Sequence, residues 1–329
     1  MTYERRTTFR RAFARLFPCV LFCLAVTGMV GVSELLAERE ILFPEAAAIA
    51  LGALVAPRLA WRTSYPALLL SIALCAFSGI LIVRVLPLPL AWQLAFAYLV
   101  GQLVLLASRI SFAPLISAVV LPVLLGTRSL VYPAAAILLT ALLLILRIML
   151  EKTGIRTAVP FSPLPPPDRH DGIALCLRSL LTAAMCLIAV RTSLLYLVCP
   201  PILVAFTEFT RPNNAAMRTP LRAAALLCAA AAIGTLSRAL LCVLLSWPLT
   251  AAAALASIAL LLLVTAQKLF LPPAAALAVL AMLLPAPALA SYPLQVLCAS
   301  AVYVGCAYLC FHSPAEKKHA SLLPALLAP

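Results

Sequence analysis

Residues 248–266 read PLTAAAALASIALLLLVTA, an apolar run without a single charged side chain. At a rise of 1.5 Å per residue, a helix of about 20 residues crosses the hydrocarbon core of a bilayer, which is about 30 Å thick. Such runs recur along the chain, because 65% of its residues are hydrophobic and 10% are charged. A soluble domain is about 45–50% apolar and about 25% charged. The composition indicates a polytopic membrane protein and excludes a water-soluble enzyme, a free nucleic-acid binder and a disulfide-stapled secreted domain.

Apolar segments between charges and prolines predict an all-α membrane bundle of about twelve short transmembrane helices. They run at about 16–36, 41–57, 66–86, 90–107, 113–126, 130–150, 173–190, 194–208, 220–244, 248–266, 271–286 and 292–311. Segments 113–126 and 271–286 are short for a full span, so each could be re-entrant. Both contain prolines, and broken helices persist in lipid only where they face protein or a wet cavity. Four prolines are therefore candidates for lining a path: Pro114, Pro122, Pro272 and Pro273.

A polar, proline-rich stretch divides the chain. Residues 151–172 contain five prolines and several charges, which predicts an extended linker. It separates a first six-helix region, 1–150, from a second, 173–312, and a tail follows at 313–329. Each region contains an even number of predicted spans.

Basic residues gather at alternate ends of the predicted helices. The chain has a net charge of +14, and the positive-inside rule assigns the end richer in lysine and arginine to the cytoplasm. If all twelve segments cross, the poorer end keeps five basic residues: Arg39, Arg84, Arg128, Arg191 and Arg238. Both termini are then predicted in the cytoplasm, and the protein in the cell (inner) membrane. The arginine-rich start is also typical of an organellar transit peptide, so a plastid or mitochondrial membrane stays the alternative.

The two halves resemble each other in the order of their basic, proline and aromatic residues. Seven pairs follow one another at offsets between 152 and 160 residues: Arg39/Arg191, Pro66/Pro220, Arg84/Arg238, Trp92/Trp247, Arg109/Lys268, Phe112/Phe270 and Tyr132/Tyr292. With an even number of spans per half, such an order predicts two parallel six-helix pseudo-repeats related by an axis along the membrane normal. Transporters are commonly built this way, with the solute path at the repeat interface.

The second half reads CPPILVAFTEFTRPNNAAMRTPLRAAALLCAAAAIGTL from Cys199, followed by KLFLPPAAALAVLAMLLP from Lys268 and YPLQVLCASAVYVGCAYL from Tyr292. This layout resembles the HPP family of integral membrane proteins over about 170–312 and, more faintly, 17–150. Leu271-Pro272-Pro273 stands where the family has His-Pro-Pro. The resemblance implies a multi-pass, permease-like tandem protein, with small-anion (nitrite) transport attributed to some plant members. A weaker similarity is to the fusaric-acid-resistance-type aromatic-acid exporters.

Ionisable side chains inside apolar segments are costly, which makes them candidates for solute binding. Arg84 and Arg238 each follow a helix-opening proline by 18 residues. They predict either an anchor to the headgroups or a guanidinium pair that draws an anion. Glu45 and Glu208 are the acidic candidates; Glu208 could pair with Arg211 on one helix turn, or a buried glutamate could relay protons.

The sequence therefore predicts a permease for a small anionic solute, with its path at the interface of the two repeats. The alternatives are a membrane scaffold without transport and an aromatic-acid exporter. No catalytic, metal-ligating or cofactor motif is present in the sequence, so no enzyme activity, metal or cofactor is expected. The expected partners are the lipid bilayer, the solute and, as an option, further copies of the chain, and nucleic acid is not expected.

Overall fold

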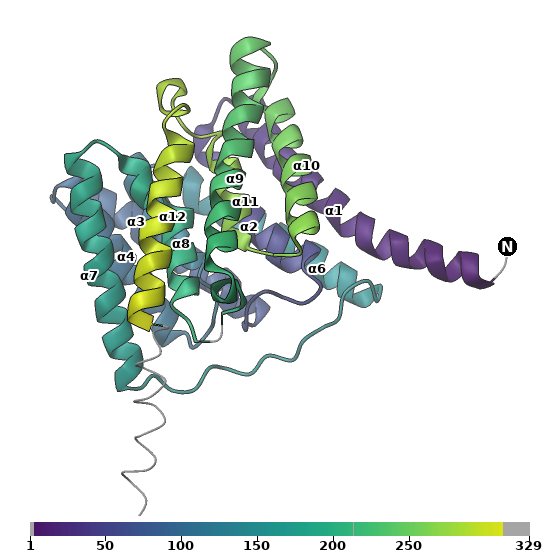
Figure 1. Cartoon of the computed structure of the whole chain (residues 1–329), viewed down its shortest axis with the longest axis horizontal. Helices are drawn as coiled ribbons and strands as arrows, with labels where there is room; N and C mark the ends of the chain where they lie inside the picture. Colours follow the sequence, from purple (N-terminus) through teal and green to yellow (C-terminus); the bar gives the residue numbers. More distant parts are fainter. Residues whose placement is uncertain (1–2, 213, 312–329) are drawn as a thin grey trace, which may run out of the picture.

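The computed structural model describes residues 3–212 and 214–311, and side-chain surroundings from residue 14 onward except at 213 and 215. This part of the chain is all-α, with twelve α-helices (Figure 1). Eight of these helices are long and apolar enough to cross a membrane. They are α1 (Tyr3–Leu35), α3 (Tyr65–Val85), α4 (Leu90–Ala107), α6 (Val131–Lys152), α7 (Arg169–Arg191), α9 (Pro220–Arg238, continued by a π-helical turn to Leu244), α10 (Leu249–Gln267) and α12 (Tyr292–Phe311). The predicted tail at 313–329, with Lys317 and Lys318, lies outside the described residues.

The other four helices are too short to span a bilayer. They are α2 (Glu45–Ala50, continued by a π-helical turn to Val55), α5 (Leu115–Leu125), α8 (Pro200–Phe209) and α11 (Pro272–Leu280). α8 and α11 begin at a proline, and α2 and α5 begin directly after one. Proline suits the start of a helix but keeps the residue before it out of helical geometry. At 113–126 and 271–286 the sequence left a re-entrant segment open but favoured a full crossing, and α5 and α11, with 11 and 9 residues, are too short for a helical span. Full spans were predicted at 41–57 and 194–208, and there the prediction is wrong, because α2 begins only after Pro44 and α8 only at Pro200.

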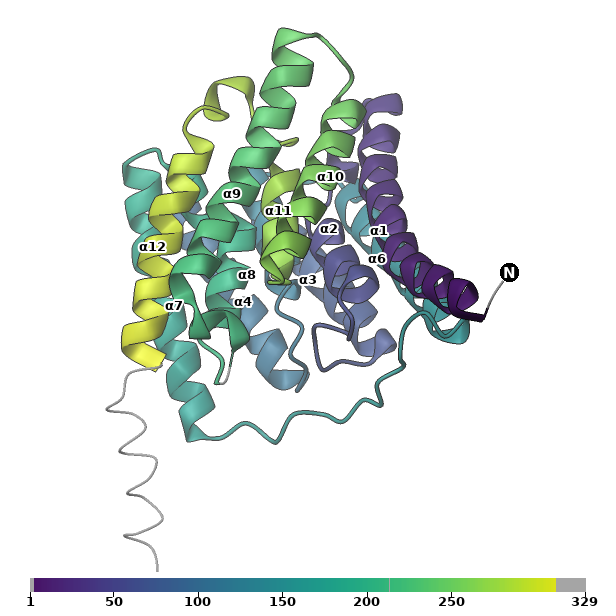
Figure 2. The ribbon, with the colours of Figure 1, turned by 45° about the vertical axis from the view of Figure 1, so that its right-hand side comes forward.

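The short helices form the centre of the bundle, and the long helices surround them (Figures 1 and 2). Every residue of α2, α8 and α11 is buried. Inside the bundle α2 packs against α11, and α8 packs against both α5 and α11. A helix that is apolar on all sides belongs in such an interior. Around this core, α1 packs on α10 and α4 on α7, so each half of the chain holds the other.

Two glycines let long helices approach the short ones closely. A Cβ atom at Gly79 of α3 would lie 2.6 Å from the carbonyl oxygen of Val119 in α5. At Gly234 of α9 it would lie 2.1 Å from the carbonyl oxygen of Ala278 in α11. Small residues at helix crossings allow this backbone contact. At Gly234 the neighbouring atoms all belong to the backbone of Ala278, whereas at Gly79 the ring of Pro122 also packs against α3.

Connections alternate between two ends of the bundle. At one end, here called the linker end, residues 153–168 run from α6 to α7 (Figure 2). Arg109 fixes the linker there through two hydrogen bonds to Leu164. The backbone N–H of Leu164 donates to the backbone carbonyl of Arg109 at 2.8 Å, and Nε of Arg109 donates to the backbone carbonyl of Leu164 at 2.7 Å. At the opposite end, Arg39 donates to the carbonyl of Leu283 at 2.7 Å. Of the five basic residues predicted for the poorer end, Arg39 and Arg238 line one cavity at this end.

Candidate functional site

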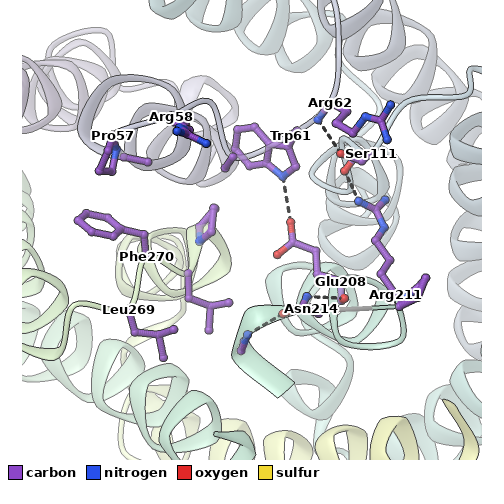
Figure 3. A pocket seen from close by; sticks show the side chains of 16 residues that line it. Pro57, Arg58, Trp61, Arg62, Ser111, Glu208, Arg211, Asn214, Leu269 and Phe270 are labelled. Atoms are coloured by element: carbon purple, nitrogen blue, oxygen red, sulfur yellow. Dashed lines mark hydrogen bonds between the residues drawn. The ribbon is translucent and has the colours of Figure 1, made fainter. Parts of the chain in front are cut away.

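A cavity of about 730 Å³ opens at the linker end, between the first and second halves of the chain (Figure 3). The first half contributes the loop after α2 and the loop before α5. The second half contributes the end of α8, the loop after it and the start of α11. The lining residues are Ala56, Pro57, Arg58, Ala60, Trp61, Arg62, Ser111, Glu208, Arg211, Pro212, Asn214, Ala216, Leu269, Phe270, Leu271 and Pro272. A cavity of this size is typical of small-molecule sites.

A tryptophan–glutamate hydrogen bond joins the two halves across this cavity. The indole N–H of Trp61 donates to Oε1 of Glu208 at 2.9 Å (Figure 3). The Trp61 ring is 4% exposed and meets the ring of Phe112 edge to face at 5.0 Å. Its other side lies over Gly52, where a Cβ atom would come within 2.4 Å of the indole. The ring is therefore fixed from both sides, and it holds the carboxylate in place.

Arg211 stands beside this carboxylate but does not pair with it. The guanidinium of Arg211 donates to the backbone carbonyl of Ser111. The backbone carbonyl of Glu208 accepts a hydrogen bond from Nδ2 of Asn214 at 2.6 Å. The Glu208–Arg211 ion pair weighed from the sequence is absent from the salt bridges of the described residues. Burial lowers the pKa of Arg211 to about 10, and the nearby Glu208 charge opposes this shift. The guanidinium stays charged at neutral pH.

The charge in the cavity is positive. Arg58, Arg62 and Arg211 line it, and Glu208 is the acidic residue among its lining. Arg62 also reaches the linker, donating to the hydroxyl of Ser162 at 2.9 Å. Low-dielectric walls focus the field of such charges into a cleft and raise the local concentration of counter-ions. A field of this sign favours a negatively charged ligand over a positively charged one.

A second cavity, of about 350 Å³, lies at the opposite end. Arg39 and Arg238 line it, together with Glu34 of α1. Arg238 donates to the carbonyls of Ala281, at 2.7 Å, and of Leu284, beyond the end of α11. Glu34 accepts from the backbone N–H of Leu249 at 2.7 Å, which caps α10. The Glu34 and Arg238 side chains are thus held by helix ends.

Two of the short helices, α2 and α11, run from one cavity to the other. Leu42, before α2, lines the smaller cavity, and Ala56, after its π-helical turn, lines the larger one. Pro272 begins α11 at the larger cavity, and Met282 follows its end at the smaller one. Between these points α2 and α11 pack directly and are fully buried. A closed wall two helices thick therefore separates the two cavities.

The arginine and proline candidates from the sequence are spread over the bundle. Arg84 is exposed in the last turn of α3 and lines neither of these cavities; its Nε donates to the carbonyl of Arg128 at 2.8 Å. Arg238 lines the smaller cavity. Pro272 lines the larger cavity, and Pro273 is buried beside it in the first turn of α11. Pro114 caps α5, and Pro122 lies within α5 against Gly79.

Glu45 begins α2 in the centre of the bundle and is 1% exposed. Its Oε1 accepts a hydrogen bond from the hydroxyl of Ser117 on α5. Its Oε2 is buried and has no hydrogen-bond partner among the described residues. The structure thus keeps Glu45 apart from Glu208, the other acidic candidate, which faces the large cavity.

Sequence reasoning missed two arginines that terminate α2. Arg147 of α6 is 1% exposed, donates to the carbonyl of Ala53 at 2.7 Å and pairs with Glu151 at 2.7 Å. Arg156 of the linker donates to the carbonyls of Leu54 and Val55, at 2.8 and 2.9 Å. The last carbonyls of a helix have no partner within it, so these guanidinium groups satisfy them. Burial lowers the pKa of Arg156, and the charge of Arg147 adds to this shift.

A buried polar cluster between α4, α7 and α8 was also missed. Thr207 accepts from Nε2 of Gln102 at 2.8 Å and lies 2.9 Å from the hydroxyl of Tyr98. Arg178 of α7 donates to Thr210 at 3.2 Å. The visible signal was Arg178, an arginine well inside the apolar run 173–190. The cluster fixes α8, and through it the position of Glu208.

No family model, no curated protein and no solved structure matches this chain. The resemblance to the HPP family and the weaker similarity to aromatic-acid exporters therefore stay predictions. Among the described residues, no group of three or more histidine, cysteine, aspartate or glutamate side chains could hold a metal ion. What the chain offers chemically is two arginine-bearing cavities and a wall of broken helices between them.

Proposed function

We propose that this protein is a multi-pass membrane permease for a small anion, with its path between the two cavities along α2 and α11. The observation that carries the proposal is that two arginine-lined cavities open at opposite ends of one pair of central, broken helices. Non-helical backbone at membrane depth persists where protein buries it or where it lines a pathway. The four short helices of this bundle meet that condition.

We further infer that the two halves are parallel pseudo-repeats. In each half a long helix is followed by a short one, two long ones, a short one and a long one. Tyr132 donates to the carbonyl of Ala118 in α5 at 3.0 Å, and Tyr292 donates to that of Leu277 in α11 at 2.8 Å. Gly79 of α3 allows α5 to approach closely, and Gly234 of α9 does the same for α11. The path then lies at the repeat interface, where the large cavity opens.

The positive-inside rule orients the protein. The linker end collects most of the described basic residues, so we place it in the cytoplasm together with both termini, in the cell membrane. The large cavity would then face the cytoplasm and the small one the exterior.

The proposed mechanism uses the arginines of the large cavity and the contact between α2 and α11. Arg58, Arg62 and Arg211 draw an anion into the large cavity, where a guanidinium offers a planar fork of donors to an oxyanion. The Trp61–Glu208 hydrogen bond ties the halves together beside this site and must yield or shift when they move. Rocking one half against the other would part α2 from α11 and open the smaller cavity, as in other repeat-built carriers.

An aromatic carboxylate is the second candidate solute. Trp61 and Phe270 line the large cavity, and its volume of about 730 Å³ exceeds what a triatomic anion needs. Aromatic side chains stack on aromatic solutes, while the arginines would bind the carboxylate. This candidate corresponds to an exporter of aromatic acids.

The test is uptake of labelled anions into proteoliposomes, with nitrite first and benzoate second, against empty liposomes. The variant is Arg58→Gln/Arg211→Gln, which removes two charges from the large cavity. The matched control is Arg84→Gln, which removes an exposed charge that lines neither cavity.

We expect uptake by the wild type and by Arg84→Gln, and a strong loss in the cavity variant. Equal uptake by all three proteins would place the path elsewhere. Uptake of neither anion above empty liposomes would overturn the proposal and favour a scaffold without transport.

A further inference from the structure

We propose that Glu45 is the proton-carrying group of this permease, so that a proton crosses with each anion. This inference rests on the proposed function and adds its coupling ion. It is carried by a buried carboxyl with one unpartnered oxygen, placed inside the wall between the two cavities.

Glu45 lies where a coupling group must lie. It is three residues beyond Leu42, which lines the smaller cavity, and the rest of α2 separates it from Ala56 at the larger one. The helix that carries it packs against α11, the other side of the wall. Any movement that parts α2 from α11 therefore changes the surroundings of this carboxyl.

The contacts of Glu45 do not compensate a negative charge. Ser117 gives one hydrogen bond to Oε1, and Oε2 has no partner within the described part of the chain. The titratable side chains close enough to feel a charge on Glu45 are Tyr132 of α6, Tyr292 of α12 and Cys199 before α8. All three are neutral at pH 7 when unperturbed.

The charged groups on neighbouring helices are engaged elsewhere. α11 has no ionisable side chain. Glu34 of α1 is bound to the start of α10, and Arg147 of α6 is bound to Glu151 and to the far end of α2. An isolated ionised carboxylate in apolar surroundings is strongly disfavoured, so the group prefers the neutral acid. The wall is thus closed around a protonated Glu45.

The step is a simple proton transfer. In the outward-open state an O–H bond forms on the Glu45 carboxylate when a proton arrives from water in the smaller cavity. In the inward-open state that bond breaks, and the proton passes to water in the larger cavity. One proton moving with one monovalent anion leaves the net charge transfer at zero. The reverse order would serve export.

Two measurements test this inference. The first is infrared spectroscopy of the protein in lipid at neutral pH, because a carboxylic acid has a C=O stretching band that carboxylates and amides lack. The second is paired flux in proteoliposomes: labelled nitrite exchange at equal pH on both sides, and proton uptake reported by trapped pyranine when a nitrite gradient is applied. Wild type is compared with Glu45→Gln and with the control Glu38→Gln, whose Oε1 accepts from the nearby N–H of Glu40.

We expect the acid band in the wild type and in Glu38→Gln, and its loss in Glu45→Gln. We expect Glu45→Gln to keep nitrite exchange at equal pH and to lose proton uptake. Wild-type exchange without proton uptake would overturn the coupling, whether or not the variant folds. An unchanged acid band in Glu45→Gln would overturn the assignment to this residue, whereas absence of nitrite exchange in the wild type would contradict nitrite as the solute of the proposed permease.

Discussion

Replacing Gly234 by alanine tests how closely α9 packs on α11, one of the two helices that separate the cavities. The new Cβ atom would lie 2.1 Å from the carbonyl oxygen of Ala278 and 3.0 Å from its Cα atom. Both neighbours are backbone atoms of α11, which cannot rotate away as a side chain would. The helix crossing must therefore widen by about 1 Å to restore van der Waals contact.

Overpacking of this kind costs about 1–3 kcal/mol, and a backbone clash belongs at the upper end. Alanine is favoured over glycine within a helix by about 1 kcal/mol, which offsets part of the cost. We expect a net loss of about 2 kcal/mol, which corresponds to several degrees in the unfolding temperature of a protein of this size. Because α11 forms the wall, anion flux should change as well.

The assay is thermal unfolding in one detergent at one scan rate, since unfolding of membrane proteins is commonly irreversible. Gly305→Ala in α12 is the matched control, because a Cβ atom there meets nothing within 4 Å. Its unfolding temperature should stay the same or rise slightly. The reasoning is refuted if Gly234→Ala unfolds at the same temperature as Gly305→Ala.

Three further substitutions probe the contacts around the cavities. Gly52→Ala should displace the Trp61 ring, because the nearest ring atom would lie 2.4 Å from the new Cβ atom. The wavelength of the indole emission should therefore shift, and an unchanged emission spectrum would contradict the contact. Arg147→Met should destabilise the protein by about 3–5 kcal/mol, because it removes the ion-pair partner of Glu151 and leaves the carbonyls of Ala53 and Thr157 without their donor; thermal unfolding measures this. Arg84→Gln, at an exposed arginine, should cost about 0–1 kcal/mol by the same assay, and a loss as large as that of Arg147→Met would show that exposure is a poor guide here.

The eight long helices and the linker could be predicted from sequence, because each depends on local composition. Long apolar runs set the eight long helices. The short helix α8 was misjudged because residues 194–208 are as apolar as a true span. Length of apolar sequence does not distinguish a spanning helix from a broken helix in a protein interior.

The large cavity could not be predicted, because its lining comes from loops that only tertiary packing brings together. Glu208 was identified by its cost in an apolar segment, but its partner Trp61 is 147 positions away. Arg84 and Arg238 stood out by their repetition, and the structure bonds both to backbone carbonyls near the ends of short helices. An arginine that recurs at equivalent positions of two halves can serve the same structural contact in each half rather than bind a solute.

The central claim, that the large cavity binds anions, is tested most directly by the fluorescence of Trp61. The other tryptophans, Trp92 and Trp247, are 50% and 56% exposed on the outside of the bundle, so Trp92→Phe/Trp247→Phe leaves Trp61 as the sole reporter. Iodide is the probe, since it quenches indole on contact. The account predicts saturable quenching that nitrite or benzoate competes away and that Arg58→Gln/Arg211→Gln abolishes. Linear quenching of equal slope with and without the two arginines would contradict it.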